Sequence, residues 1–86
     1  MTQDQPSDKP IIVDARGLNC PLPVLRLRKR LKDIAAGSVV ELLATDRAAL
    51  RDVPAFCTGQ GHEVALVVEE GDGTLRFRIR KIGSAA

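Results

Sequence analysis

Aromatic residues are scarce in this sequence of 86 residues, which has no tryptophan, no tyrosine and two phenylalanines, Phe56 and Phe77. Proteins that bind single-stranded nucleic acid usually stack the bases on aromatic side chains. The formal net charge is also low, at +2. The composition therefore argues against direct binding of nucleic acid.

Histidine is also scarce, and His62 is the only one in the sequence. A zinc site needs three or four clustered Cys, His or carboxylate ligands, and a cysteine hydrolase needs a histidine beside its thiolate. His62 could be such a base only if the fold brought it to Cys20. A partly buried, hydrogen-bonded turn position is the simpler expectation. Glycine-rich nucleotide loops are also absent, so we expect no metal and no cofactor.

Cysteine is limited to Cys20 and Cys57. Two cysteines are too few for a disulfide scaffold and are typical of a reducing compartment. No Cys-x-x-Cys motif is present, so a stand-alone redox protein would need a Cys20–Cys57 disulfide. We expect Cys57 to pack in the core, the alternative being a resolving thiol for Cys20.

Long hydrophobic runs are missing too. No window approaches the roughly 18 consecutive apolar residues of a membrane span, and the polar N-terminus has no apolar signal core. We therefore expect a cytoplasmic protein without membrane contact. The proline-containing residues 1–10 predict a flexible leader, residues 11–82 a single domain and residues 83–86 a flexible tail.

The patterns that are present indicate four strands. A β-branched run at 11–13 predicts an interior strand, and the mostly apolar run at 39–44 predicts a central one. Residues 63–69 predict a third strand, and Gly and Asp in the next four residues predict a hairpin loop. The last strand alternates strictly between an apolar and a basic face, with Leu75, Phe77 and Ile79 opposite Arg76, Arg78 and Arg80.

Two helices are predicted between these strands. The first has one buried stripe and Gly37 as its C-terminal cap, the stripe being Val24, Leu27, Leu31 and Ile34. The second follows a Thr45-Asp46 cap, is broken at Pro54 or restarts near Asp52, and ends at Gly59 and Gly61. The order β-α-β-α-β-β predicts an α/β (α+β) two-layer sandwich, a mixed four-stranded sheet with both helices on one face.

Cys20 is the best candidate for chemistry, because it directly precedes a helix that opens with prolines. We expect Pro21 at the first helical position and Pro23 inside the first turn, so that the amides of Leu22 and Val24 face the sulfur. The positive end of the helix dipole would then lower the thiol pKa. Gly17 allows the chain to turn tightly or to adopt a positive φ before the helix. The alternative is that Cys20 is a small, inert apolar residue.

Basic residues form two clusters, one at 26–32 and one in the last strand at 76–81. Such clusters could attract an acidic protein or a nucleic acid, or could simply be solvated faces of a helix and a strand. An activated thiol without further catalytic machinery suits sulfur carriage, in which Cys20 holds sulfane sulfur as a persulfide and presents it to another protein.

The sequence resembles the TusA/SirA-like sulfur-carrier family from Val13 to about Lys81. The resemblance is carried by Asp-Ala-Arg-Gly-Leu at 14–18, Cys-Pro-x-Pro at 20–23 with Val24-Leu25, Arg28-Lys29, Thr45-Asp46, Asp-x-Pro-x-Phe-Cys at 52–57, Gly61-His62 and the closing Phe77-x-Ile79-x-Lys81. One departure is Arg47, where the family commonly has proline.

The resemblance implies a fold like the C-terminal domain of bacterial translation initiation factor 3, and a sulfur-accepting Cys20. It also implies that Cys20 is supported by the motif residues Asp14, Arg16, Gly17, Pro21 and Pro23. It also implies that the basic first helix is a surface for docking partner proteins, through Arg26, Arg28, Lys29 and Arg30.

Two partners follow from the resemblance. The sulfur donor would be a cysteine desulfurase or a rhodanese-like protein, and a downstream relay protein would accept the sulfur. That relay often ends in 2-thiouridine of tRNA, and in other members it supplies molybdenum cofactor or sulfur oxidation. We therefore interpret the chain as a sulfurtransferase in the broad sense, a carrier rather than a complete catalyst. The alternative is a non-catalytic regulatory or interaction module that binds a partner through its basic helix.

Overall fold

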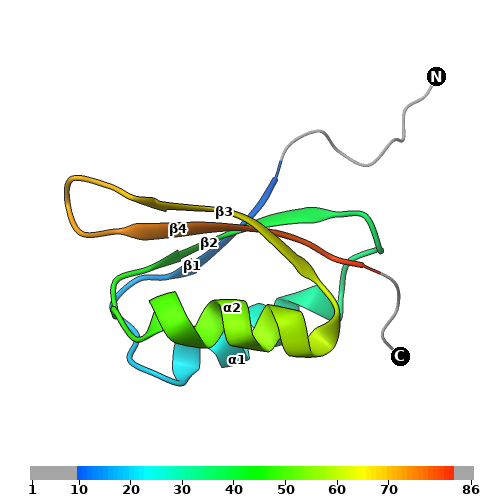
Figure 1. The fold of residues 1–86 in the computed structure, drawn as a ribbon, viewed down its shortest axis with the longest axis horizontal. Helices are drawn as coiled ribbons and strands as arrows, with labels where there is room; N and C mark the ends of the chain where they lie inside the picture. Colours follow the sequence, from blue (N-terminus) through cyan, green and yellow to red (C-terminus); the bar gives the residue numbers. More distant parts are fainter. Residues whose placement is uncertain (1–9, 83–86) are drawn as a thin grey trace.

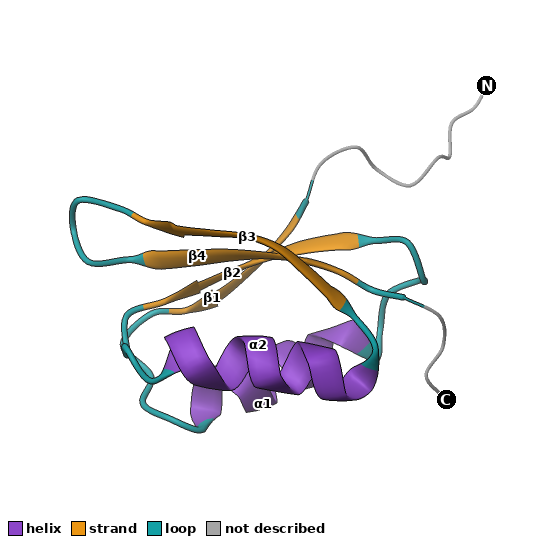
Figure 2. Ribbon diagram, in the orientation of Figure 1, coloured by secondary structure: helices purple, strands orange, loops and turns teal. Residues whose placement is uncertain are grey.

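Two helices lie against one face of a four-stranded sheet in the computed structural model, which describes residues 10–82 (Figure 1). The elements are β1 (Ile11–Ala15), α1 (Leu22–Leu31), β2 (Val39–Ala44), α2 (Ala49–Gln60), β3 (Glu63–Glu69) and β4 (Leu75–Arg80). Figure 2 shows the strand layer and the helix layer side on. The predicted two-layer sandwich is confirmed. The predicted tail and the first nine residues of the predicted leader lie outside the described residues.

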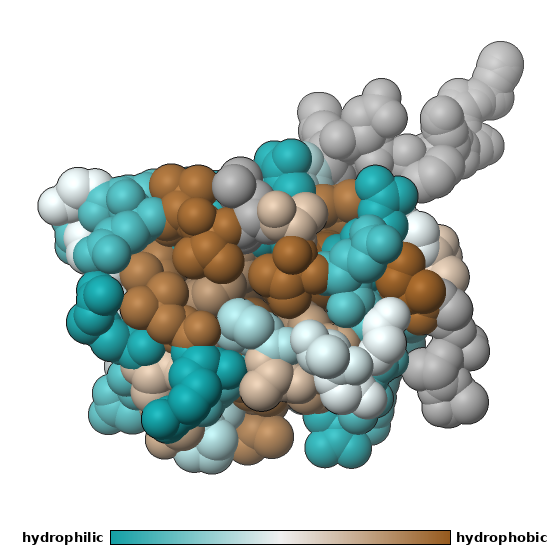
Figure 3. Space-filling model, in the orientation of Figure 1, coloured by the Kyte–Doolittle hydropathy of each residue, from teal (hydrophilic) through white to brown (hydrophobic). Residues whose placement is uncertain are grey.

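The strands are ordered β1-β2-β4-β3, with β1 parallel to β2 and both other pairs antiparallel. The central position of β2 is confirmed, but β1 is an edge strand, and the prediction of an interior strand is wrong. A β-branched run identifies a strand without fixing how many neighbours it has. Ile12 is accordingly 52 % exposed. The other edge strand, β3, also exposes apolar side chains, Val67 and Val68, and brown atoms gather over it in Figure 3.

The core lies between the sheet and the helices. Alternate residues of the two central strands point toward the helices, and the pairs Leu42–Phe77 and Val40–Ile79 are fully buried. The helices cover them with residues spaced three or four apart, which are Pro23, Leu27 and Leu31 from α1 and Ala49, Val53 and Cys57 from α2. Each helix therefore presents one narrow apolar stripe to the sheet.

The first helix ends earlier than predicted. Its C-terminal cap is Lys32 rather than Gly37, and Ile34 packs on the core from the following turn. The last part of the chain contacts this end, where the ammonium of Lys81 donates hydrogen bonds to the carbonyls of Leu31 and Ile34 at 2.6 and 2.7 Å. These bonds satisfy carbonyls that a helix end leaves without partners.

The second helix runs through Pro54 without the predicted break. A proline inside a helix removes a backbone hydrogen bond and costs about 3 kcal/mol. Here the buried residues Ala49, Val53 and Cys57 lie at spacings of four on both sides of Pro54, so packing holds the two halves in line. Gly61 ends the helix, with φ at +81°, as predicted, whereas Gly59, which was also predicted to end it, lies inside its last turn. Within residues 10–82 no helix has the length and apolar character needed to cross a membrane.

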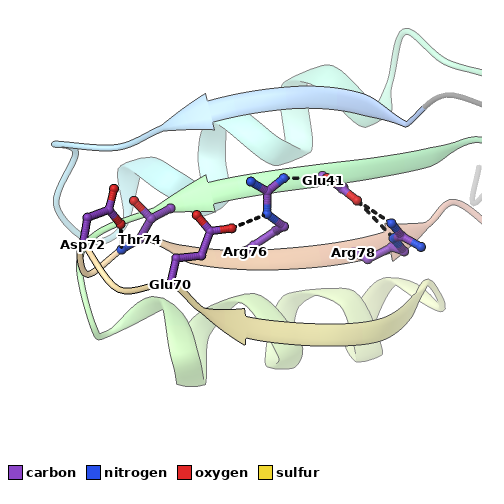
Figure 4. A network of polar contacts seen from close by, with 6 residues as sticks. All are labelled: Glu41, Glu70, Asp72, Thr74, Arg76 and Arg78. Atoms are coloured by element: carbon purple, nitrogen blue, oxygen red, sulfur yellow. Dashed lines mark hydrogen bonds and ion pairs between the residues drawn. The ribbon is translucent and has the colours of Figure 1, made fainter.

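The sheet face opposite the helices carries a network of ion pairs (Figure 4). Glu41, whose side chain is 8 % exposed, accepts hydrogen bonds from Arg76 at 2.7 Å and from Arg78 at 2.6 Å. Arg76 also donates to Glu70 at 2.8 Å. The hydrogen bond from Arg78, assisted by Arg76, holds the pKa of Glu41 below its usual value. The basic residues of β4 are therefore largely neutralised inside the molecule.

Candidate functional site

Cys20 is an exposed free thiol in the turn between β1 and α1. The Cys20–Pro21 peptide bond is cis, Pro21 occupies the N-cap position, and Pro23 is buried in the first turn of α1. Pro21 therefore stands one residue before the first helical position that we predicted for it. The amide of Leu22 donates a hydrogen bond to the carbonyl of Asn19 at 2.8 Å and is not aimed at the sulfur, which is a second correction.

Two carboxylates, one just before α2 and one in its first turn, lie close to Cys20. The sulfur lies 2.8 Å from Oδ2 of Asp52, and the backbone amide of Cys20 donates to Oδ2 of Asp46 at 2.7 Å. Asp52 belongs to the first turn of α2, and Asp46 immediately precedes this helix. At this distance the thiol of Cys20 can donate its proton to the carboxylate of Asp52.

This contact reverses the predicted acidity of Cys20. The hydrogen bond to Asp52, followed by desolvation and the charges of Asp52 and Asp46, raises the thiol pKa above its usual value. The positive end of a helix dipole is worth about half a unit charge, whereas Asp52 carries a full negative charge at hydrogen-bond distance. The predicted lowering of the Cys20 pKa is therefore wrong.

The position of Cys20 is fixed by the loop that follows β2. Because β1 and β2 are parallel and Ala15 pairs with Ala44, their following loops start side by side. Gly17, with φ at +82°, donates from its backbone to Oγ1 of Thr45 at 2.9 Å, and the next residue, Asp46, holds the amide of Cys20. The positive φ predicted as possible for Gly17 is confirmed.

Asp14 and Arg16, the other residues of the predicted motif, form an exposed bidentate ion pair. Nε and Nη2 of Arg16 each lie 2.9 Å from a carboxylate oxygen of Asp14. These hydrogen bonds lower the pKa of Asp14 to about 2. The pair stands at the end of β1, where the turn toward Cys20 begins. Within residues 10–82 the side chains of Asp14 and Arg16 form hydrogen bonds only between these two residues.

A groove of about 630 Å³ runs between the edge strand β1 and α1. Three of the four predicted docking residues, Arg26, Lys29 and Arg30, line it, whereas Arg28 does not. Its apolar lining includes Ile12, Leu22 and Leu25, which are 47–52 % exposed. No ion pair among residues 10–82 engages the four basic residues of α1, in contrast to Arg76 and Arg78 on β4.

The remaining candidate groups are separate from Cys20. Cys57 is fully buried and free, and burial raises its pKa to about 11, which confirms a packing role and leaves no disulfide with Cys20. His62 follows the far end of α2, and its Nδ1 accepts the amide of Ile82 at 3.1 Å. The predicted hydrogen-bonded turn position is thus confirmed. In the described part of the chain, no group of three His, Cys, Asp or Glu side chains could hold a metal.

Asp52 is the site residue that the sequence analysis missed. It was recognised as a helix-capping candidate and as part of the Asp-x-Pro-x-Phe-Cys run, but not as a neighbour of Cys20, which lies 32 residues earlier. The parallel pairing of β1 and β2, which brings the two loops together, could have supplied this signal.

Comparisons with known proteins identify the family of this chain. The family model of "Sulfurtransferase TusA" matches residues 11–81. The chain is 48 % identical over 69 residues to the sulfur carrier protein TusA of Pseudomonas entomophila, covering 80 % of this chain and 85 % of the relative. It is 46 % identical over 70 residues to that of Pseudomonas putida, covering 81 % and 86 %.

A solved structure extends the comparison to the fold. The crystal structure of a SirA-like protein from Desulfitobacterium hafniense superimposes with a TM-score of 0.76 at 28 % identity. It covers 85 % of this chain and 99 % of that one. Because the family model spans all six elements and the relatives match over most of their length, this chain belongs to the TusA family.

Proposed function

We propose that this protein is a sulfur carrier that accepts sulfane sulfur on Cys20 as a persulfide and passes it to a partner protein. The observation that carries the proposal is the exposed free thiol of Cys20, whose loop is held at the start of α1 by backbone amides that donate to the side chains of Thr45 and Asp46. A carrier thiol must be reachable by two partners in turn, and the buried Cys57 is not. Membership of the TusA family supports the same role.

The proposed donor is a cysteine desulfurase or a rhodanese-like protein, and the proposed acceptor is the next protein of a sulfur relay. Transfer needs no cofactor on this chain, since the donor brings the sulfur already in the sulfane state. Synthesis of 2-thiouridine in tRNA is the pathway that we propose to test first. The expected result is a lower 2-thiouridine content of tRNA, measured by mass spectrometry, in cells whose only copy is Cys20→Ser.

The groove between β1 and α1 is the proposed docking surface. Arg26, Lys29 and Arg30 line it beside Asp14 and Asp33 but form no ion pair within 4 Å among residues 10–82, so they are available to acidic side chains of a partner. Exposed Ile12, Leu22 and Leu25 add apolar area beside that charge. Leu22 follows Cys20 by two residues, so a partner seated in the groove would reach the thiol.

The deciding experiment is intact-mass spectrometry after incubation with a cysteine desulfurase, its pyridoxal phosphate and cysteine. We expect a gain of one sulfur atom that reductant removes. The matched variants are Cys20→Ser, which should gain none, and Cys57→Ser, which should gain as much as the native chain. Sulfur uptake by Cys20→Ser would show that Cys20 is not the carrier, and no uptake from any donor would favour the interaction module.

A further inference from the structure

Asp52 is the only side chain within residues 10–82 that forms a hydrogen bond with the sulfur of Cys20. Its side chain is 25 % exposed, and its two oxygens have different neighbours. Oδ2 faces the sulfur at 2.8 Å, while Oδ1 lies 3.4 Å from Nε of the exposed Arg51. A carboxylate that only capped α2 would not need to reach across to another loop.

We propose that Asp52 is a catalytic residue that takes the proton of the Cys20 thiol when sulfur is loaded and returns it when sulfur is released. The assignment rests on the proposed carrier function of Cys20 and adds to it the group that handles the proton. Asp52 touches the reacting atom itself, from a fixed position in the first turn of α2.

The loading step balances with these groups alone. The Cys20 sulfur attacks the outer sulfur of the donor persulfide, the sulfur–sulfur bond of the donor breaks, and a new sulfur–sulfur bond forms on Cys20. The donor cysteine leaves as a thiolate, and the proton of Cys20 moves to Oδ2 of Asp52. The transferred sulfur keeps its oxidation state, so no oxidant or reductant is consumed. On release a thiolate of the acceptor attacks the outer sulfur, a sulfur–sulfur bond forms on the acceptor and the one on Cys20 breaks, and the proton of Asp52 goes to the departing Cys20 sulfur.

The surroundings explain why an acceptor is needed. A thiol is a poor nucleophile compared with its thiolate, and the hydrogen bond to Asp52 at 2.8 Å raises the pKa of the Cys20 thiol and so disfavours the thiolate. The histidine that fills this role in many cysteine enzymes is not available, because His62 stands beyond the opposite end of α2. The described residues therefore offer Asp52 as the nearest group that can receive the proton.

The test compares two reactions of Cys20 across a range of about pH 6 to pH 8.5 in the native chain and in Asp52→Asn. Iodoacetamide alkylation reports how much thiolate is present, and sulfur uptake from a persulfidated cysteine desulfurase, followed by intact mass, reports the transfer itself. In Asp52→Asn we expect faster alkylation at neutral pH, because the charge that raises the thiol pKa is gone. We expect sulfur uptake to be slower, by about 10- to 100-fold.

The pH profile separates this role from a merely structural one. Native uptake should change little with pH, whereas uptake by Asp52→Asn should rise about tenfold per pH unit until the thiol ionises. Asp52→Glu, which keeps a carboxylate, should recover part of the native rate. The control is Glu63→Gln, an exposed carboxylate on β3 that loses the same charge and should behave as the native chain.

Other outcomes would overturn the assignment. If alkylation and sulfur uptake both accelerate in Asp52→Asn, Asp52 only suppresses the thiolate and takes no part in transfer. If uptake is unchanged in a variant whose circular dichroism is native, the contact is structural. If the native chain takes up no sulfur but Asp52→Asn is still alkylated faster than the native chain, the carrier function fails. The assignment then fails with it, although the contact between Asp52 and Cys20 exists.

Discussion

Cys20 and Cys57 share one side-chain chemistry but sit in opposite environments. Cys20 is exposed beside a carboxylate, whereas Cys57 has no accessible surface and packs under the sheet among residues such as Val53 and Phe77. Desolvation alone raises the pKa of Cys57 to about 11, so its thiolate is negligible at neutral pH. Burial, rather than the residue type, decides which of the two thiols can react.

We predict that Cys57→Ala lowers the free energy of unfolding by about 1–3 kcal/mol, because it leaves a small cavity in a fully buried site. Sulfur uptake on Cys20 should be unchanged. Urea denaturation followed by circular dichroism measures the first quantity, since the chain has no tryptophan to report by fluorescence. Cys20→Ala, at an exposed position, should change stability by less than about 0.5 kcal/mol. Equal losses in the two variants would contradict this division of roles.

The chemistry of single residues was predictable only in part from the sequence. The placement of Cys20 directly before α1 and the packing role of Cys57 followed from local patterns, namely prolines after one cysteine and an apolar helix around the other. The acidity of Cys20 did not follow, because it depends on Asp52, which is distant in sequence and reaches the sulfur through the tertiary fold.

Helix α1 divides its basic residues between the groove and the outer surface. Arg26, Lys29 and Arg30 line the groove, and Arg28 is exposed elsewhere on the helix. The sequence could not make this distinction, since the four residues differ only in their angle around the helix and the groove exists only once β1 lies beside α1. In the structure three of the basic residues therefore line the groove and Arg28 does not, so variants of the two kinds can be compared.

We predict that Lys29→Glu slows sulfur uptake from a cysteine desulfurase by about tenfold at low salt, whereas Arg28→Glu has a clearly smaller effect. Both variants change the net charge equally, so the contrast isolates position from charge. Uptake rates measured by intact mass at several salt concentrations provide the test, and the difference should shrink as salt screens the contact. Equal slowing would mean that overall charge, rather than the groove, recruits the donor.

Element boundaries depended on contacts that join distant parts of the chain. The strand ranges 39–44, 63–69 and 75–80 agree with the sequence prediction, because alternation and turn residues mark them locally. The end of α1 does not agree, and Lys81 caps it from beyond β4. The continuity of α2 through Pro54 was missed for a similar reason, since burial against the sheet outweighs the local cost of proline.

Charge is distributed unevenly over the whole molecule. The open face of the sheet holds a closed network in which Glu41 joins Arg76 and Arg78, and α1 presents basic residues without such partners among residues 10–82. The sequence showed two basic clusters of similar appearance. Only the order β1-β2-β4-β3, which places β4 next to Glu41 on β2, shows that the strand cluster is internally paired and the helix cluster is not.

The same distribution predicts how stability responds to acid. The pKa values of Asp14, Glu41, Asp46 and Asp72 all lie below their usual values of 3.8 for Asp and 4.5 for Glu. A carboxylate with a lowered folded pKa contributes stability above its unfolded pKa, and this contribution is lost as the pH falls through the folded pKa. The free energy of unfolding should therefore be steady near neutral pH and fall below about pH 4.5.

We predict that Glu41→Gln is less stable than the native chain by about 1–2 kcal/mol at pH 7, because two partly exposed arginines lose their shared charge. The difference should narrow as the pH falls, since acid protonates the native Glu41 and removes the same charge. Urea denaturation at three pH values, followed by circular dichroism, measures both effects. The control is Glu63→Gln, which breaks the 3.7 Å pair with Arg80 and should change neither the stability at pH 7 nor its pH dependence. If the difference in stability between Glu41→Gln and the native chain stays constant with pH, the linkage to Glu41 is refuted.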